Sequence, residues 1–268
     1  MTAYLARIVI FPVKALEGMV VPAATVRPGG MLANDRRYAL VDGAGRYING
    51  KRTPLVHTLR VRYVENASRI AIMGGQDGVE RVFDLTSDRA ALEEYLSDHF
   101  GLQVHVIEDA ERGLPDDTQA PGPTVVSTAS LEAVAEWFGL ELDEVRRRFR
   151  ANLEIGGVPA FWEDRLYGPP GVAVPFRVGS VIWEGTNPCR RCVVPTRHPD
   201  TGTPLPGFIE RFRVLREKTL PDWASRSRFD HFYRFAVNTR PTANFQPGVI
   251  RVGDPVSVCD ATASDPGT

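Results

Sequence analysis

Two cysteines separated by two arginines are the residues of this chain best suited to chemistry. Cys189 and Cys192 enclose Arg190 and Arg191 in a C-x-x-C pattern. The thiolate, rather than the thiol, is the nucleophile and the metal ligand, and neighbouring guanidinium groups favour the thiolate form. Two arginines are also expensive to bury without anionic partners. We therefore favour a functional thiolate at Cys192 over the alternative, two inert buried cysteines.

Three other chemistries fit this cysteine pair less well. A zinc site needs further thiolate or imidazole ligands at short spacing, and only Cys259 and five scattered histidines are available. A conventional iron–sulfur cluster needs four thiolates, whereas the sequence has three cysteines. A thioredoxin-like dithiol begins a helix, but the Val-Val-Pro-Thr sequence at 193–196 predicts extended chain.

Cations from distant parts of the sequence form a second candidate set. Lys14 follows the first predicted strand and Arg36 precedes another, while Arg150 and Asn152 alternate at strand spacing and are expected to face the same way. Arginine grips phosphate with two parallel hydrogen bonds. If these side chains converge, they form a pocket for a phosphate or pyrophosphate. The neighbouring arginines at 146–148 are interpreted as a solvated helix face.

Other motifs carry no function. The segment Gly45–Lys51 matches the start of a P-loop, but Arg52 replaces the required Ser or Thr, so nucleotide hydrolysis is excluded. Glu163 and Asp164 form an acidic pair that we interpret as structural, at the surface or at a strand end. The G-x-S-x-G pattern of many serine hydrolases is absent.

The hydrophobic pattern predicts a mostly β protein with peripheral helices, of the α+β class. Short strands dominate both ends of the chain, as in a barrel or sandwich. Helices are expected from Ser87 to Phe100, after Ser127 up to Gly139, at 142–149 and at 208–218. We predict an N-terminal β-rich domain at 1–108 and a second domain at 124–260, with a linker or loop at 109–123 and a tail at 261–268.

Bulk properties limit the function classes. The 268 residues carry a net charge of −1, so no global field favours nucleic acid or an anionic membrane. The sequence has no apolar run of the length that spans a bilayer, and its first residues do not resemble a secretion signal. With few cysteines, a cytoplasmic location is expected.

Taken together, the motifs resemble the MOSC family, including its N-terminal β-barrel region. The resemblance spans roughly residues 4–258. It is carried in the family's order by these segments: Phe11–Lys14, Asp35–Arg36, Lys51–Leu55, Phe149–Leu153, Glu163–Asp164, Pro188–Cys192, Pro199–Gly202 and Gly248–Asp254.

This resemblance implies a MOSC β-barrel fold that holds a molybdenum–molybdopterin cofactor, as in molybdenum cofactor sulfurases and amidoxime-reducing proteins. By matching motifs, Cys192 is the metal ligand and catalytic residue. The resemblance implies cofactor binding by Lys14, Arg36, Arg150, Asn152 and Arg191. Arg190 is added to this set because its charge is expected near the cofactor. At family level only, pyridoxal phosphate binding is also associated with such domains.

The sequence departs from the family pattern at Ala15, where relatives often have Ser, and at Arg190, where they have a smaller polar residue. The resemblance implies an oxidoreductase that reduces a small oxygenated substrate, such as an N-hydroxylated base. Electrons are expected from a separate ferredoxin- or flavin-type partner protein. Two alternatives remain: a sulfur-transfer protein carrying a persulfide on Cys192, and a non-catalytic cofactor carrier.

Overall fold

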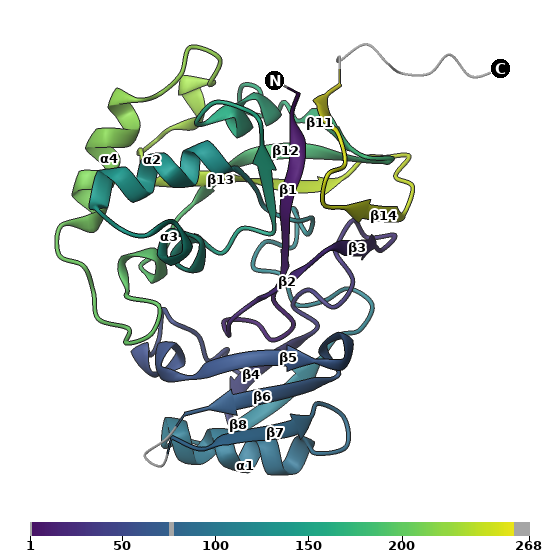
Figure 1. Cartoon of the computed structure of the whole chain (residues 1–268), viewed down its shortest axis with the longest axis vertical. Helices are drawn as coiled ribbons and strands as arrows, with labels where there is room; N and C mark the ends of the chain where they lie inside the picture. The colour runs from purple at the N-terminus through teal and green to yellow at the C-terminus, as the bar shows by residue number, and fades with distance from the viewer. Residues whose placement is uncertain (1, 75–77, 260–268) are drawn as a thin grey trace.

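A computed structural model describes residues 2–74 and 78–259 of the chain. The fold is mostly β with four α-helices among these residues, in agreement with the predicted α+β class. Figure 1 shows a large sheet and three helices at one end of the molecule, and smaller sheets with a single helix at the other. The tail expected at 261–268 lies outside the described residues.

The large sheet has eight strands in the order β15-β11-β12-β13-β9-β10-β1-β2. Most neighbours are antiparallel, but β9 and β10 run parallel. Its buried side chains, including Leu5, Phe176 and Trp183, form one continuous core. The strands span Tyr4–Ile10 (β1), Met19–Val21 (β2), Val125–Ser127 (β9), Leu153–Gly156 (β10), Val174–Val178 (β11), Val181–Arg190 (β12), Arg234–Pro241 (β13) and Val256–Val258 (β15).

The other end of the molecule contains two small antiparallel sheets and one helix around a separate core. One sheet pairs β4 (Tyr38–Asp42) with β8 (Val104–Glu108), and the other has the order β5-β6-β7. The latter strands span Arg60–Val64, Arg69–Met73 and Glu80–Asp84. Helix α1 (Arg89–Phe100) buries one face and ends at Gly101, whose left-handed backbone (φ 64°) explains the glycine.

Three helices cover one side of the large sheet: α2 (Thr128–Phe138), α3 (Leu142–Phe149) and α4 (Phe208–Lys218). Ser127 caps α2 by accepting a hydrogen bond from the Ser130 amide, and Gly139 ends it, as predicted. An aromatic cluster around Phe149 and Phe212 packs these helices together.

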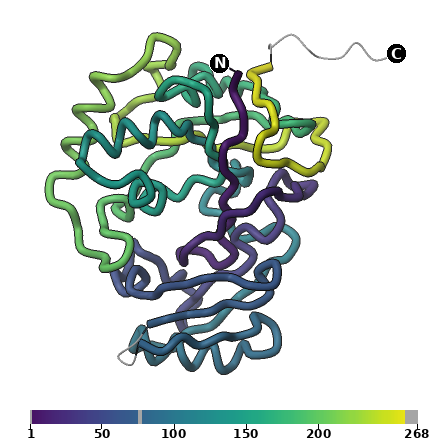
Figure 2. The backbone as a smooth tube through the Cα atoms, viewed as in Figure 1, coloured from purple at the N-terminus to yellow at the C-terminus, as the bar shows by residue number. Residues whose placement is uncertain are grey.

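Strands from the N-terminal and C-terminal halves of the chain pair with each other. β1 pairs with β10, and β3 (Ala23–Val26) pairs with β14 (Gly248–Arg251). Figure 2 shows the N-terminal segment running beside the C-terminal one, in line with the hydrogen bond from the Leu5 amide to the Asp254 carbonyl. The division of the chain at 109–123 stays a prediction. The first 26 residues also contribute strands that pair with strands of the C-terminal half.

One local prediction of secondary structure is wrong. The residues after Cys192 form a short 3-10 helix, Val194–Thr196, instead of extended chain, since Pro195 fits the first turn of a helix. No helix among the described residues is long and apolar enough to cross a membrane.

Candidate functional site

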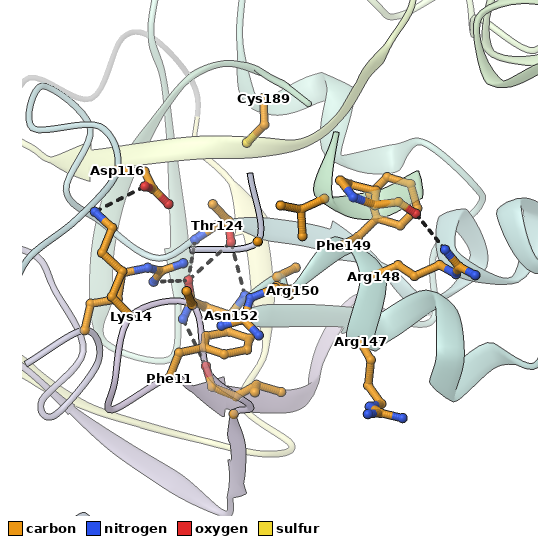
Figure 3. A pocket seen from close by; sticks show the side chains of 18 of the residues that line it. Phe11, Lys14, Asp116, Thr124, Arg147, Arg148, Phe149, Arg150, Asn152 and Cys189 are labelled. Carbon is orange, nitrogen blue, oxygen red and sulfur yellow. Dashed lines mark hydrogen bonds and ion pairs between the residues drawn. The ribbon is translucent and has the colours of Figure 1, made fainter. Parts of the chain in front are cut away.

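A cavity of about 920 Å³ lies where the two ends of the molecule meet. Its wall includes residues from β1, the loop after it, the 3-10 helix at Pro54–Thr58, residues 115–122, α3 and the end of β12. Seven residues singled out in the sequence all lie on this wall: Lys14, Arg36, Arg150, Asn152, Arg190, Arg191 and Cys192. Figure 3 shows part of this wall.

Three cavity residues have a backbone conformation that non-glycine residues rarely adopt. Ala15, Arg36 and Arg150 have φ of 72°, 50° and 56°. A left-handed conformation costs roughly 1–2 kcal/mol for a residue with a Cβ atom. At Arg150, which ends α3, glycine is the common choice. Strain of this kind is common at functional sites, although six other described non-glycine residues with positive φ lie outside the cavity.

Asn152 holds Arg36 in place. The Asn152 side chain is buried, and its amide group donates to the Val9 carbonyl (3.0 Å) and to the Asp35 carboxylate (3.1 Å). Its oxygen accepts from Arg36 (3.3 Å) and from Thr124. Asp35 also pairs with Arg36 directly. The amide of Asn152 is therefore fully engaged by the protein, and its role in this geometry is to orient Arg36.

Arg150 is presented to the cavity by a different route from the one predicted. It lies at the end of α3 in left-handed conformation, and Asn152 precedes β10, so the expected strand alternation is wrong. Its guanidinium donates to the Leu16 carbonyl (2.6 Å) and lies 4.2 Å from the centre of the Phe11 ring. Burial and the charge of Arg36 lower the pKa of Arg150 to about 10, which leaves it cationic at neutral pH.

The ammonium group of Lys14 is occupied by the loop that follows β8. It donates to the carbonyls of Leu114 (3.0 Å) and Pro115 (3.2 Å) and pairs with the Asp116 carboxylate (3.2 Å), as Figure 3 shows for Asp116. Burial alone raises the pKa of Asp116, but the charges of Lys14 and Arg36 lower it overall. An anionic side chain thus lies where a phosphate bound to Lys14 would lie.

Both cysteines line the same cavity as the cations, one near the end of β12 and one just after it. Cys189 is buried within β12, and its thiol lies 2.6 Å from the Asn238 side-chain oxygen. Burial raises the pKa of Cys189 to about 11, although Arg191 acts in the opposite direction. Cys192 follows the strand and is partly exposed. Both cysteines line the cavity, and Cys192 is the more exposed residue of the two.

The arginines between the cysteines differ in their surroundings. Arg190 is exposed, whereas Arg191 donates to the Phe149 carbonyl and lies 5.4 Å from that residue's ring centre. The Nε atom of Arg191 is buried and has no hydrogen-bond partner among the described residues. A buried donor without a partner costs about 1–3 kcal/mol, so this atom is suited to a ligand.

The interpretation of residues 146–148 as a solvated helix face is wrong. Arg148 is 4% exposed and donates to the carbonyls of Pro195 (3.0 Å) and Arg197 and to the Glu144 carboxylate. Arg147 contacts Asp200 and lines the cavity. The run of arginines did not predict the burial of Arg148, because the carbonyls that accept its hydrogen bonds, those of Pro195 and Arg197, lie in a turn that is distant in the sequence.

His57 is a cavity residue that sequence reasoning missed. Its Nε2 atom is buried and finds no partner within residues 2–74 and 78–259. Burial, followed by the charges of Arg150 and Arg197, lowers the pKa of His57 to about 4, so its imidazole is neutral. The sequence offered no signal, since this histidine stands alone on a short 3-10 helix.

Glu163 and Asp164 lie outside the cavity and have structural contacts, as predicted. Both are buried, whereas the prediction placed them at the surface or at a strand end. Asp164 pairs with Arg216 and accepts from Tyr167 (2.8 Å). Glu163 accepts from Ser130 (3.0 Å), and burial raises its pKa to about 7. Both acids join the large sheet to the helices that cover it.

The residues of this cavity suit a molybdopterin-type group. The volume lies in the range of roughly 300–1,000 Å³ common for small-molecule sites. Lys14, Arg36 and Arg150 provide cations for a phosphate, Arg191 and His57 provide unpartnered polar atoms, and Cys192 provides a soft thiol ligand.

Comparisons with known proteins identify the family of this chain. Residues 2–142 match the MOSC N-terminal beta barrel domain, and residues 123–257 match the MOSC domain. A molybdenum cofactor sulfurase of Drosophila grimshawi is 24% identical over 288 aligned positions, covering 95% of this chain and 34% of that protein. A sulfurase of Caenorhabditis elegans is 25% identical over 115 residues, covering 43% of this chain and 15% of that protein.

The chain therefore spans about a third or less of these curated relatives. Among solved structures, the YuaD protein of Bacillus subtilis is similar over 96% of both chains, at 12% identity and a TM-score of 0.40. Each of the two domain models covers about half of the chain, and together they cover nearly all the described residues. The chain belongs to the MOSC family, with an N-terminal MOSC β-barrel domain and a MOSC domain.

Proposed function

We propose that this protein binds a molybdenum cofactor and uses it to reduce a small oxygenated substrate, such as an N-hydroxylated base. One observation carries the proposal: an accessible thiol and a set of cations from distant segments line the same cavity. The family, which is associated with chemistry of this cofactor, supports the choice of ligand.

Within this proposal, different cavity residues contact different parts of the cofactor. The sulfur of Cys192 is the metal ligand. Arg36 and Arg150 would hold the phosphate, with Asn152 orienting Arg36. Lys14 joins them when the phosphate takes the position of the Asp116 carboxylate. Arg190 and Arg191 add positive charge next to Cys192 in the chain.

When bound, the cofactor supplies two-electron oxygen-atom transfer. Reduction of an N-hydroxylated base breaks its N–O bond, consumes two electrons and two protons, and releases water. The chain contributes binding and orientation, while the electrons come from a separate ferredoxin- or flavin-type protein.

The test is a reduction assay with protein from a host that makes the cofactor. Reduced methyl viologen serves as electron donor and benzamidoxime as substrate. We expect steady formation of benzamidine by the wild type and a loss of at least about 100-fold in Cys192→Ser. Cys259→Ser, which alters a cysteine outside the cavity, is the control. Equal rates in wild type and Cys192→Ser contradict the proposal.

Sulfur transfer is the second candidate, favoured by the similarity to molybdenum cofactor sulfurases. In that case Cys192 carries a persulfide, and persulfide labelling of Cys192 is found in protein without bound metal. A third candidate, a cofactor carrier, binds the cofactor but turns over no substrate with the artificial reductant. The same assay with measured cofactor content therefore distinguishes all three.

A further inference from the structure

A second hollow of about 590 Å³ lies beside the main cavity, on the outer surface of the large sheet. It adjoins the main cavity because Arg7, Val20, Arg146 and Glu154 lie on the walls of both. Thr128 and other residues line only this outer cleft. None of the residues assigned to cofactor binding lies on its wall.

Arg7 is a cation without a counterion in this cleft. It lies on β1 opposite Glu154 of β10, which is the carboxylate that would normally pair with it. However, Arg146 already binds both oxygens of Glu154, at 2.8 and 2.7 Å. The Arg7 guanidinium makes no hydrogen bond or ion pair within the described part of the chain, and its Nε atom is buried. Two guanidiniums facing one carboxylate leave one positive charge unbalanced.

Thr128 supplies a second unpartnered polar group on the same wall. It is the first residue of α2, and its buried hydroxyl oxygen has no hydrogen-bond partner among residues 2–74 and 78–259. The hydroxyl is not needed to cap the helix, because Ser127 fulfils that role. The N-terminus of α2 adds partial positive charge.

The rest of the cleft is largely apolar. Tyr4, Val20 and Val252 are 45%, 51% and 45% exposed there. An apolar surface beside an unpaired guanidinium and a free hydroxyl suits a molecule with one anionic group and a short hydrocarbon body.

We propose that this outer cleft binds a small amphiphilic anion, a carboxylate or a phosphate monoester, through Arg7 and Thr128. The anion accepts hydrogen bonds from the terminal nitrogens of the Arg7 guanidinium and, after rotation of the Thr128 side chain, from its buried hydroxyl, while its apolar body covers Val20 and its neighbours. The proposal is independent of the cofactor assignment, because it requires neither Cys192 nor the phosphate-gripping cations.

The test is titration of the purified full chain with hexanoate and with hexyl phosphate, using inorganic phosphate as the head group alone. Binding is followed by calorimetry and by the NMR resonance of the Arg7 Nε–H group. We expect saturable binding of at least one hexyl compound, with inorganic phosphate about tenfold weaker or more. The preferred head group identifies which anion the cleft accepts.

Variants locate the binding. Arg7→Gln is expected to weaken it about tenfold or more and Thr128→Val about threefold, since a charged hydrogen bond contributes more than a neutral one. Two control substitutions should change nothing. Arg177→Gln removes an exposed strand arginine outside both hollows, and Lys51→Gln removes a cation of the main cavity only.

Stability gives a further readout, because a structural arginine and a ligand-binding one behave differently. Since Arg7 makes no bond within the described chain, Arg7→Gln should leave the Tm unchanged or raise it. The proposal is overturned by any of three results: no saturable binding, full binding in Arg7→Gln and Thr128→Val, or binding that Lys51→Gln abolishes. The last result places the anion in the main cavity.

Discussion

At the scale of single residues, the cavity combines strained backbone with side chains whose hydrogen bonds are incompletely used. Arg36 and Arg150 adopt a left-handed backbone that glycine would adopt without strain. Arg191 and His57 keep buried polar atoms without partners in the described chain. Each feature lowers the stability of the protein, and all are explained if the cavity is shaped for a polar, anionic ligand.

The pairing of Lys14 with Asp116 leads to the first prediction. Replacing Asp116 with Asn removes the negative charge that competes with a phosphate for the Lys14 ammonium. We expect Asp116→Asn to bind pyrophosphate about three- to tenfold more tightly than the wild type in cofactor-free protein, as measured by calorimetry. Glu111→Gln, which removes an exposed charge from the same connection, is the matched control. Equal tightening in both variants would point to a general charge effect.

His57 predicts how stability depends on pH in protein without cofactor. Its pKa is lowered from 6.5 to about 4, so the unfolded chain takes up this proton at a higher pH than the folded one. Stability is therefore lost as pH falls from about 6.5 to about 4. His57→Gln should lose about 1–3 kcal/mol less over this range, measured by urea unfolding at both pH values. Identical losses in the two proteins would show that His57 does not contribute.

At the scale of elements, helix α3 and the residue that ends it contribute several side chains to the cavity wall. It ends with Arg147, Arg148 and Arg150, which contact three different parts of the cavity wall. Arg148 is buried and connects the helix to the 3-10 turn that follows Cys192, through the carbonyls of Pro195 and Arg197. This connection fixes the position of the cysteine relative to the cations.

Removal of the Arg148 connection is therefore expected to destabilise the fold. Arg148→Met leaves two carbonyls and the Glu144 carboxylate without their partner, so the free energy of unfolding should fall by about 2–4 kcal/mol. Arg213→Met, on the exposed face of α4, should change it by less than about 0.5 kcal/mol. Urea unfolding measures both, and a similar small change in both variants would mean that Arg148 contributes little.

The elements could be predicted from sequence where local signals decide them. Ser127 and Gly139 mark the ends of α2, and Gly101 ends α1, because caps are set by nearby residues. The order of the motifs in the sequence predicted which residues belong to the candidate site. It did not predict their arrangement in space, because Arg36, Arg150 and Cys192 come together only through pairing between distant segments. Residues such as His57 and Asp116 carry no local pattern, and their role is visible only once the cavity is formed.

At the scale of the whole molecule, the cavity exists because the two ends close on each other. Arg60 of β5 and Arg147 of α3 both bind Glu17 and Asp200, with Arg147 at 2.8 and 2.5 Å from these carboxylates. These four charges connect the N-terminal strands to the helices over the large sheet. Cys192 and the cations Lys14, Arg36 and Arg150 thereby line one cavity, although they come from segments far apart in the sequence.

The central claim, that Cys192 and this cavity hold a molybdenum cofactor, is tested most directly by measuring metal and pterin in the intact protein. Wild type, Cys192→Ser and Cys259→Ser are purified from a host that makes the cofactor, and each is analysed by native mass spectrometry and metal analysis. We predict stoichiometric molybdenum and pterin in the wild type and in Cys259→Ser, and loss of molybdenum in Cys192→Ser. Wild type without molybdenum, or equal molybdenum in all three proteins, contradicts the claim.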